Sequence, residues 1–169
     1  VENLIAREER AGLHEQQIVD LYRSYMDEAR VNALRLAPIQ EELNAVLAVN
    51  SPADVARWMA RPMHESVIGL GVDLDEKDPL RYALYVGQSG LGLPGREYYL
   101  SDEAPFPAFR KAYVAYIAGV LSRAGIDRSA ERAADILRFE TDLATAHWTP
   151  EEARERLKNY NPMSMEELA

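Results

Sequence analysis

The hydrophobic pattern of this chain changes its period twice, and this change limits the possible folds more than any other feature. Three segments, residues 16–36, 106–123 and 128–147, repeat apolar side chains every three or four positions, which is typical of amphipathic helices. Between the first and the second, residues 67–87 alternate apolar residues with polar residues or glycine, apart from a polar stretch at 75–79. This alternation predicts two strands joined by a turn. The sequence therefore predicts a mainly α fold, a multi-helix lobe with one β-hairpin at about residues 67–87.

Signals for helix ends agree with this prediction. Ser and Thr side chains cap the first turn of a helix, proline is favoured at its first position, and glycine lets the chain leave its last turn. The stretch from Pro38 to Leu47 predicts one more helix. The remaining signals are Ser51 with Pro52 at a helix start, Pro62 and Gly125 at helix ends, and capping boxes that begin at Thr149 and Ser164.

Length, charge and composition exclude several classes of protein. A chain of 169 residues suits one compact domain with a sizeable core, and no linker divides it. The net charge of −9 opposes binding to nucleic acid. The absence of cysteine removes disulfides, thiol nucleophiles and zinc–thiolate sites. No apolar run approaches the roughly 20 residues of a membrane span, and no signal peptide is evident. We expect the chain to be a single partial domain, because it lacks an initiator Met and begins and ends within helix-like sequence.

A G-x-G-x-x-G pattern, formed by Gly90, Gly92 and Gly95, raises the question of a nucleotide site. Such a site requires a helix directly after the glycines, because the helix N-terminus binds the phosphates. Here only residues 96–104 precede Pro105, and no second strand with an acidic residue follows. The pattern therefore predicts a loop that its Leu and Tyr neighbours hold against the core.

Two half-motifs resemble the H-E-x-x-H sequence of zinc proteases, but each lacks the second histidine. They are HEQQI at residues 14–18 and HESVI at residues 64–68, and both end in isoleucine, which cannot bind a metal. We therefore expect no metal site from His14, His64 or His147. His14 should lie on a polar helix face, and His64 and His147 should lie near helix ends and bond to backbone or water.

Other patterns also fail to define a catalytic site. The acidic stretch 73–78 lacks the glycine and glutamate of a calcium loop, so a solvated hairpin turn is favoured. Glu140 and Asp142 are two residues apart on a helix and should point to different faces. Ser89 lies in no G-x-S-x-G motif. The nine tyrosines are interpreted mainly as core residues. We therefore predict no catalytic, cofactor-binding or metal-binding residue in this chain.

The glycine loop and four other blocks together resemble one known family. The loop, from Gln88 to Leu100, is similar to the signature Q-x-G-L-x-L-P-x-R-x-Y-Y of neprilysin-type zinc endopeptidases, which include endothelin-converting enzymes and bacterial PepO. The other blocks occur in the family's order along nearly the whole chain. They are LYRSYMDE at residues 21–28, DLDEKDP at 73–79, FETDLA at 139–144 and KNYNPMS at 158–164.

This resemblance implies a fold and a function. In the family, two largely helical lobes enclose a cavity, and this chain matches part of the N-terminal lobe, which restricts the peptides that enter. The zinc ligands and the catalytic glutamate of the family lie on H-E-x-x-H and E-x-x-x-D helices, which are absent here. The resemblance thus implies a fragment of a zinc metalloendopeptidase that hydrolyses small peptides by metal-activated water. The parent holds zinc, whereas this chain binds none and is inactive alone.

The resemblance also implies partners and a source. The partners are the remaining lobe and the catalytic domain of the same polypeptide, and peptide substrates. Tyr25 stands where the family has Cys, which favours a bacterial origin, with the periplasm or cell envelope favoured over the cytoplasm.

A different class of function remains as the alternative. It is an independent helical protein-interaction module whose exposed apolar helix faces bind another protein.

Overall fold

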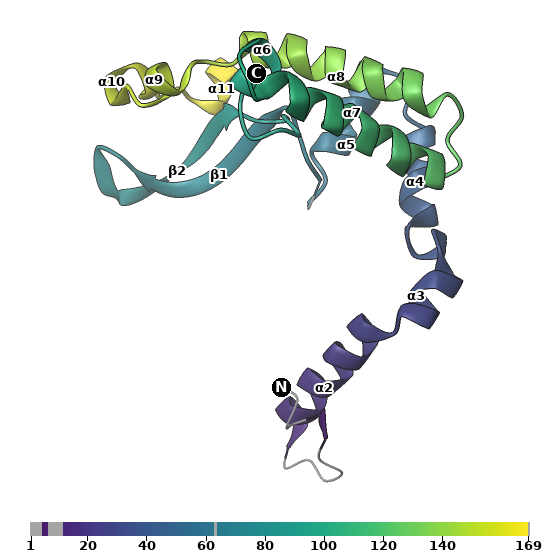
Figure 1. Ribbon diagram of the computed structural model, residues 1–169. Coiled ribbons are helices and arrows are strands. Elements are labelled where there is room, and N and C mark those ends of the chain that lie inside the picture. The colour runs from purple at the N-terminus through teal and green to yellow at the C-terminus, as the bar shows by residue number, and fades with distance from the viewer. Residues whose placement is uncertain (1–4, 7–11, 63, 169) are drawn as a thin grey trace. The chain divides into compact units, whose positions relative to one another are not determined.

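The computed structural model describes residues 5–6, 12–62 and 64–168 (Figure 1). The described residues are mainly helical, with a single two-stranded antiparallel sheet, so the predicted fold class is confirmed. The chain divides into two units, residues 1–50 and residues 51–169. No Gly/Ser-rich linker marks this division in the sequence.

The first unit is a succession of short helices. Its elements are α2 (Leu13–Met26), α3 (Glu28–Leu34), the 3-10 helix η1 (Ala37–Ile39) and α4 (Gln40–Leu47). The prediction of one helix over residues 16–36 is wrong, because the helix breaks at Asp27. The Asp27 carboxylate accepts a hydrogen bond from the Arg30 backbone N–H at 2.9 Å and so caps the start of α3. Apolar spacing continues through the break, and this local cap interrupts the backbone.

The second unit begins with α5 (Pro52–Met59), whose predicted cap is confirmed. Ser51 Oγ accepts a hydrogen bond from the Asp54 backbone N–H at 3.2 Å, and the helix ends before Pro62. A hairpin follows, formed by β1 (Ile68–Asp75) and β2 (Asp78–Gln88).

The acidic stretch forms the hairpin turn, as predicted, but the turn is not fully solvated, because Asp75 is only 6% exposed. Asp75 Oδ1 accepts hydrogen bonds from the backbone N–H groups of Lys77 at 2.8 Å and Asp78 at 3.1 Å. The Lys77 bond is the main cause of a lowered pKa of the Asp75 carboxyl. The acidic side chain therefore serves the turn itself.

Helices make up the rest of the second unit. They are α6 (Glu97–Leu100), α7 (Phe106–Arg123), α8 (Ser129–Ala146), α9 (Pro150–Ala153), α10 (Arg156–Asn159) and α11 (Met165–Leu168). The long helices α7 and α8 pack side by side, and the short α6 contacts both (Figure 1). Both predicted capping boxes are present: Thr149 pairs with Glu152, and Ser164 pairs with Glu167.

The buried core is smaller than the sequence predicts. The buried apolar residues among those described are Val19, Tyr99, Ile117, Ala133 and Ala144. The interpretation of the tyrosines as core residues is only partly correct, since Tyr25 is 82% exposed and Tyr116 is 67% exposed. Phe139, also expected to be buried, is 59% exposed. The apolar stripes of the helices are thus wider than the neighbouring elements cover. No helix in the described ranges has both the length and the apolar character needed to cross a membrane.

The end of α7 provides a test of backbone conformation with a matched control. Gly125 has φ +73°, and an added Cβ would meet no atom within 4 Å, so Gly125→Ala changes only the backbone cost. It should lower the free energy of unfolding by about 1–2 kcal/mol. Gly119 lies within α7, and the nearest atom to an added Cβ is 3.8 Å away, so Gly119→Ala should raise the free energy of unfolding by about 0.5–1 kcal/mol. Urea denaturation measures the free energy of unfolding of both variants. Changes of the same sign in the two variants would contradict this account.

Candidate functional site

The three glycines of the loop between β2 and α6 have different structural roles. Gly90 has φ +88°, and a Cβ there would lie 2.8 Å from the Cα of Val67. A Cβ on Gly92 would lie 1.9 Å from the hydroxyl oxygen of Tyr113. Gly95 has neither constraint, since a Cβ there would meet only the end of the Glu97 side chain, at 3.2 Å. The helix that follows, α6, has only 4 residues. The prediction of a loop held against the protein is therefore confirmed, and close packing explains Gly90 and Gly92 without a phosphate.

The loop packs on a buried carboxylate, Glu140 in the middle of α8. Glu140 is 9% exposed, and both of its carboxylate oxygens accept hydrogen bonds from tyrosine hydroxyls. Tyr99 of α6 donates to Oε2 at 2.7 Å, and Tyr113 of α7 donates to Oε1 at 3.0 Å. The Tyr99 hydroxyl in turn accepts a hydrogen bond from the Leu93 backbone N–H at 2.7 Å. One carboxylate thus joins three helices and the glycine loop.

The ionisation behaviour of this cluster favours a structural role. Burial, reinforced by the hydrogen bond to Glu140, raises the pKa of the Tyr99 hydroxyl above its usual range. The same two causes raise the pKa of Tyr113 to about 12. Both hydroxyls therefore keep their protons at neutral pH and remain hydrogen-bond donors. Proton transfer at neutral pH requires a group whose pKa lies near the working pH, which these tyrosines do not have.

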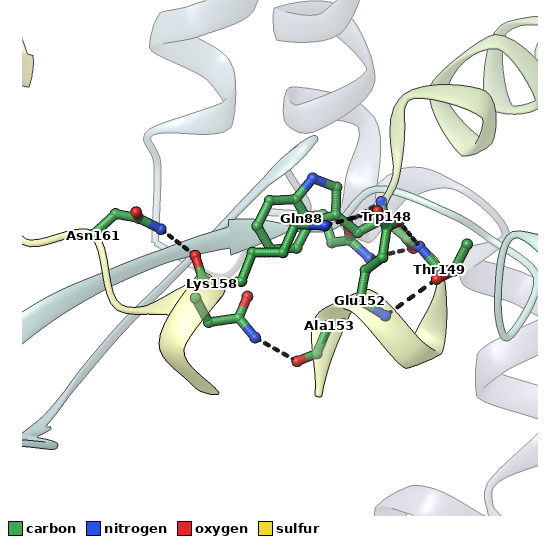
Figure 2. Close-up of polar contacts among 8 residues, drawn as sticks. Gln88, Trp148, Thr149, Glu152, Ala153, Lys158 and Asn161 are labelled. Atoms are coloured by element: carbon green, nitrogen blue, oxygen red, sulfur yellow. Dashed lines mark hydrogen bonds and ion pairs between the residues drawn. The ribbon is translucent and has the colours of Figure 1, made fainter. Parts of the chain in front are cut away.

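A second polar cluster fixes the chain after α8 to the end of β2 (Figure 2). The Trp148 backbone N–H donates to Gln88 Oε1 at 2.8 Å, and Gln88 Nε2 donates to the Trp148 carbonyl at 3.4 Å. The Lys158 ammonium lies 4.7 Å from the centroid of the Trp148 ring and bonds to Glu152 Oε1 at 2.8 Å. The side-chain amide of Gln88 thus pairs with the main chain at Trp148 much as a neighbouring strand would.

A cleft of about 340 Å³ lies between the glycine loop and this second cluster. Its lining includes Gln88, Ser89, Arg96, His147 and Trp148, which come from distant parts of the sequence. His147 Nε2 is buried and has no hydrogen-bond partner within the described part of the chain. His147 follows directly after α8, as predicted, and its Nε2 forms no bond to a described backbone group. No serine hydroxyl of the cleft is bonded to it, so Ser89 and His147 do not form a nucleophile–base pair in this structure.

The other two histidines lie where the sequence predicts. His14, in the first turn of α2, has Nδ1 3.3 Å from Gln17 Oε1. His64 Nδ1 lies 3.0 Å from the Pro62 carbonyl oxygen, and the His64 ring contacts the Trp58 ring edge to face at 4.6 Å between centroids. Within the described residues, no three His, Asp or Glu side chains come together in a way that could hold a metal ion. The described residues therefore offer no set of three ligands of the kind that a catalytic zinc site normally has.

Sequence reasoning missed the role of Glu140, although a signal for it was present. Glu140 lies seven residues after Ala133 and four before Ala144, and both alanines are fully buried. That spacing places the carboxylate on the buried stripe of α8. Asp142 is exposed, so the prediction that the two acids point to different faces is confirmed.

Comparison with known proteins gives a consistent result. The whole chain, residues 1–169, matches the description "Peptidase family M13" for its N-terminal region. Human endothelin-converting enzyme-like 1 is 27% identical over 79% of this chain and 19% of its own length. Endothelin-converting enzyme 1 of Cavia porcellus is 31% identical over 87% of this chain and 21% of its own length. The zinc metalloprotease Zmp1 of Mycobacterium tuberculosis, solved with an inhibitor, superposes with a TM-score of 0.81 at 30% identity. That superposition covers 99% of this chain and 26% of Zmp1.

The match over the whole chain and the superposition on a solved zinc metalloprotease point to a family of peptidases. The chain belongs to peptidase family M13, which confirms the resemblance found in the sequence. It spans about a fifth of the length of the curated relatives described above.

The close approach at Gly92 gives a test of the loop. Gly92→Ala would place a Cβ on the Tyr113 hydroxyl, so Tyr113 must move and lose its bond to Glu140. We expect the free energy of unfolding to fall by about 1–3 kcal/mol. The control Gly95→Ala displaces only the end of Glu97 and should have a much smaller effect. Urea denaturation measures the free energy of unfolding of both variants. Equal losses in the two variants would contradict the packing described.

The raised pKa of Tyr113 predicts a dependence of stability on alkaline pH. The unfolded chain ionises Tyr113 near its ordinary pKa of 10.0, whereas the folded chain keeps the proton up to about pH 12. The free energy of unfolding should therefore fall between pH 10 and pH 12, where only the unfolded state has lost the proton. Tyr113→Phe should make this fall less steep. The control Tyr82→Phe, at an exposed tyrosine outside this cluster, should keep the wild-type slope in urea denaturation at each pH.

Proposed function

We propose that this chain is one part of a zinc-dependent metalloendopeptidase, in which it forms wall of the reaction chamber and limits the size of the peptides that enter. The zinc ligands and the catalytic residues lie elsewhere in the same polypeptide. The observation that carries this proposal is a contrast: family M13 matches all of residues 1–169, yet the described residues form no metal-ligand cluster. The solved neighbour Zmp1 is a zinc metalloprotease, and this chain covers 26% of it.

The geometry supports a wall better than a reaction centre. The Glu140 cluster holds the glycine loop, α6, α7 and α8 together through hydroxyl groups that stay protonated. Side chains fixed in this way can shape a passage but cannot activate water. A closed wall also excludes bulk water from a reaction chamber and so strengthens the electrostatic interactions inside it.

The partners follow from the same proposal. They are the remaining lobe and the catalytic domain of the polypeptide, together with small peptides as substrates. A bacterial parent is part of the proposal, because the chain has no cysteine and a Mycobacterium tuberculosis protein superposes on 99% of it. We place this parent in the periplasm or at the cell envelope, and this chain alone is inactive.

An independent protein-interaction module is the second candidate, because large apolar side chains such as Tyr25 and Leu157 are 82% and 88% exposed. Mass spectrometry of the source protein separates the two candidates. A polypeptide several times longer than 169 residues and carrying H-E-x-x-H supports the peptidase, and a complete protein of this length supports the module.

Zinc content tests the proposal directly. In the full-length polypeptide, the triple variant His14→Ala, His64→Ala and His147→Ala should bind as much zinc per molecule as the wild type, measured by metal analysis after dialysis. The wild type should hydrolyse small peptides, should lose this activity to a chelator, and should leave folded proteins intact. This chain alone should hold no zinc and cleave no peptide. Loss of zinc in the triple variant would overturn the proposal.

A further inference from the structure

The hairpin has two unlike faces. On β1 and β2, three directly opposed pairs carry large apolar side chains: Leu70 with Val86, Val72 with Leu84, and Leu74 with Tyr82. Successive side chains on a strand point to opposite faces, so these six residues share one face, which we call the apolar hairpin face. The opposite face carries the pairs formed by Gly69, Gly71, Asp73, Ala83, Tyr85 and Gly87, with Tyr85 as the one large side chain among these three pairs. Such an asymmetry is typical of an antiparallel sheet that packs one face against another layer.

Within the second unit, no described element covers the apolar hairpin face. The exposed fractions of its six residues range from 45% at Leu74 to 73% at Tyr82. Six large side chains exposed to this degree form a patch of at least a few hundred Å², a size that on soluble proteins marks an interaction surface. A two-stranded hairpin is also only marginally stable in water unless one face packs against something else.

The hairpin is nevertheless held in place at both ends. At its tip, the Tyr160 hydroxyl donates to Asp75 Oδ1 at 3.2 Å, and the Lys77 ammonium lies 3.9 Å from the centroid of the Tyr160 ring. At its base, Gln88 pairs with the main chain of Trp148. The second unit therefore presents the apolar hairpin face as a preformed surface.

We infer that the apolar hairpin face binds an amphipathic helix from the remainder of the same polypeptide, an inference that rests on the proposed function. The relatives and the solved neighbour contain four to five times the length of this chain, since it covers 19–26% of them, so a large part of the parent is available to cover the face. A sheet with one apolar face is completed by packing a helix against that face. A second copy of the chain is disfavoured, because each copy carries a net charge of −9 and two copies repel each other.

Single-cysteine variants of the full-length polypeptide test this inference, since the chain itself contains no cysteine. Any cysteine outside this chain is first replaced by serine. Val72→Cys and Leu84→Cys place thiols on the apolar hairpin face, and Asp73→Cys places one on the opposite face. Val72 and Asp73 are adjacent and both exposed in this chain, so they are a matched pair. The measurement is the rate of reaction with a maleimide, divided by the rate of the same variant in urea.

Val72→Cys and Leu84→Cys should react at least about tenfold more slowly than Asp73→Cys in the native full-length protein, because labelling then requires the helix to separate. Equal normalised rates would overturn the inference. Protection that disappears when a dimer dissociates on dilution would also overturn it, since the occupant would then be a second copy. Peptidase activity of the wild-type polypeptide is measured in parallel. If the wild type is an active peptidase and the labelling rates are equal, the docked helix is refuted and the proposed function stands. If the thiols of Val72→Cys and Leu84→Cys are protected and the wild type has no zinc-dependent activity, the docked helix is supported and the proposed function is refuted.

Discussion

The second unit is organised around the buried carboxylate of Glu140. A buried carboxylate is costly unless its oxygens are hydrogen-bonded, and here the hydroxyls of Tyr99 and Tyr113 satisfy both oxygens. These two bonds tie α6 and α7 to α8, and the Leu93 N–H extends the network into the glycine loop. The loop can reach the cluster only because Gly92 has no side chain to displace Tyr113. Close packing on a hydrogen-bonded carboxylate therefore explains the glycine at position 92.

The surface of this chain carries much apolar area that its own elements do not bury. Phe139 and Tyr116 on the long helices and the apolar hairpin face are exposed, while the buried apolar residues are few. Membership of family M13, with relatives several times longer, accounts for this contrast, because the proposed parent has further elements to cover those faces. The absence of a metal-ligand cluster among the described residues agrees with the same division of labour. In the proposed function, chemistry and containment are encoded in different parts of one polypeptide.

The sequence predicts local structure well and fails where a local choice competes with periodicity. The bounds of α7 agree with the prediction, and both capping boxes form, because these signals depend on neighbouring residues only. The helix over residues 16–36 breaks at Asp27, because a side-chain cap interrupts the backbone without changing the apolar spacing. Phe139 has the spacing of a core residue but is exposed, since spacing shows that a face is apolar and does not show what covers it.

The sequence by itself determined the helical class, the hairpin and its turn, the helix caps and the family, because each of these depends on residue order over short distances or on motifs read in order. Only the tertiary structure decided that Glu140 joins three helices, that Gly92 must lack a side chain, and that Ser89 and His147 line one cleft without bonding. Such relations connect residues far apart in the sequence, up to the 85 positions between Asp75 and Tyr160. Which side chains meet across such distances depends on how the elements pack, and local sequence does not encode that packing.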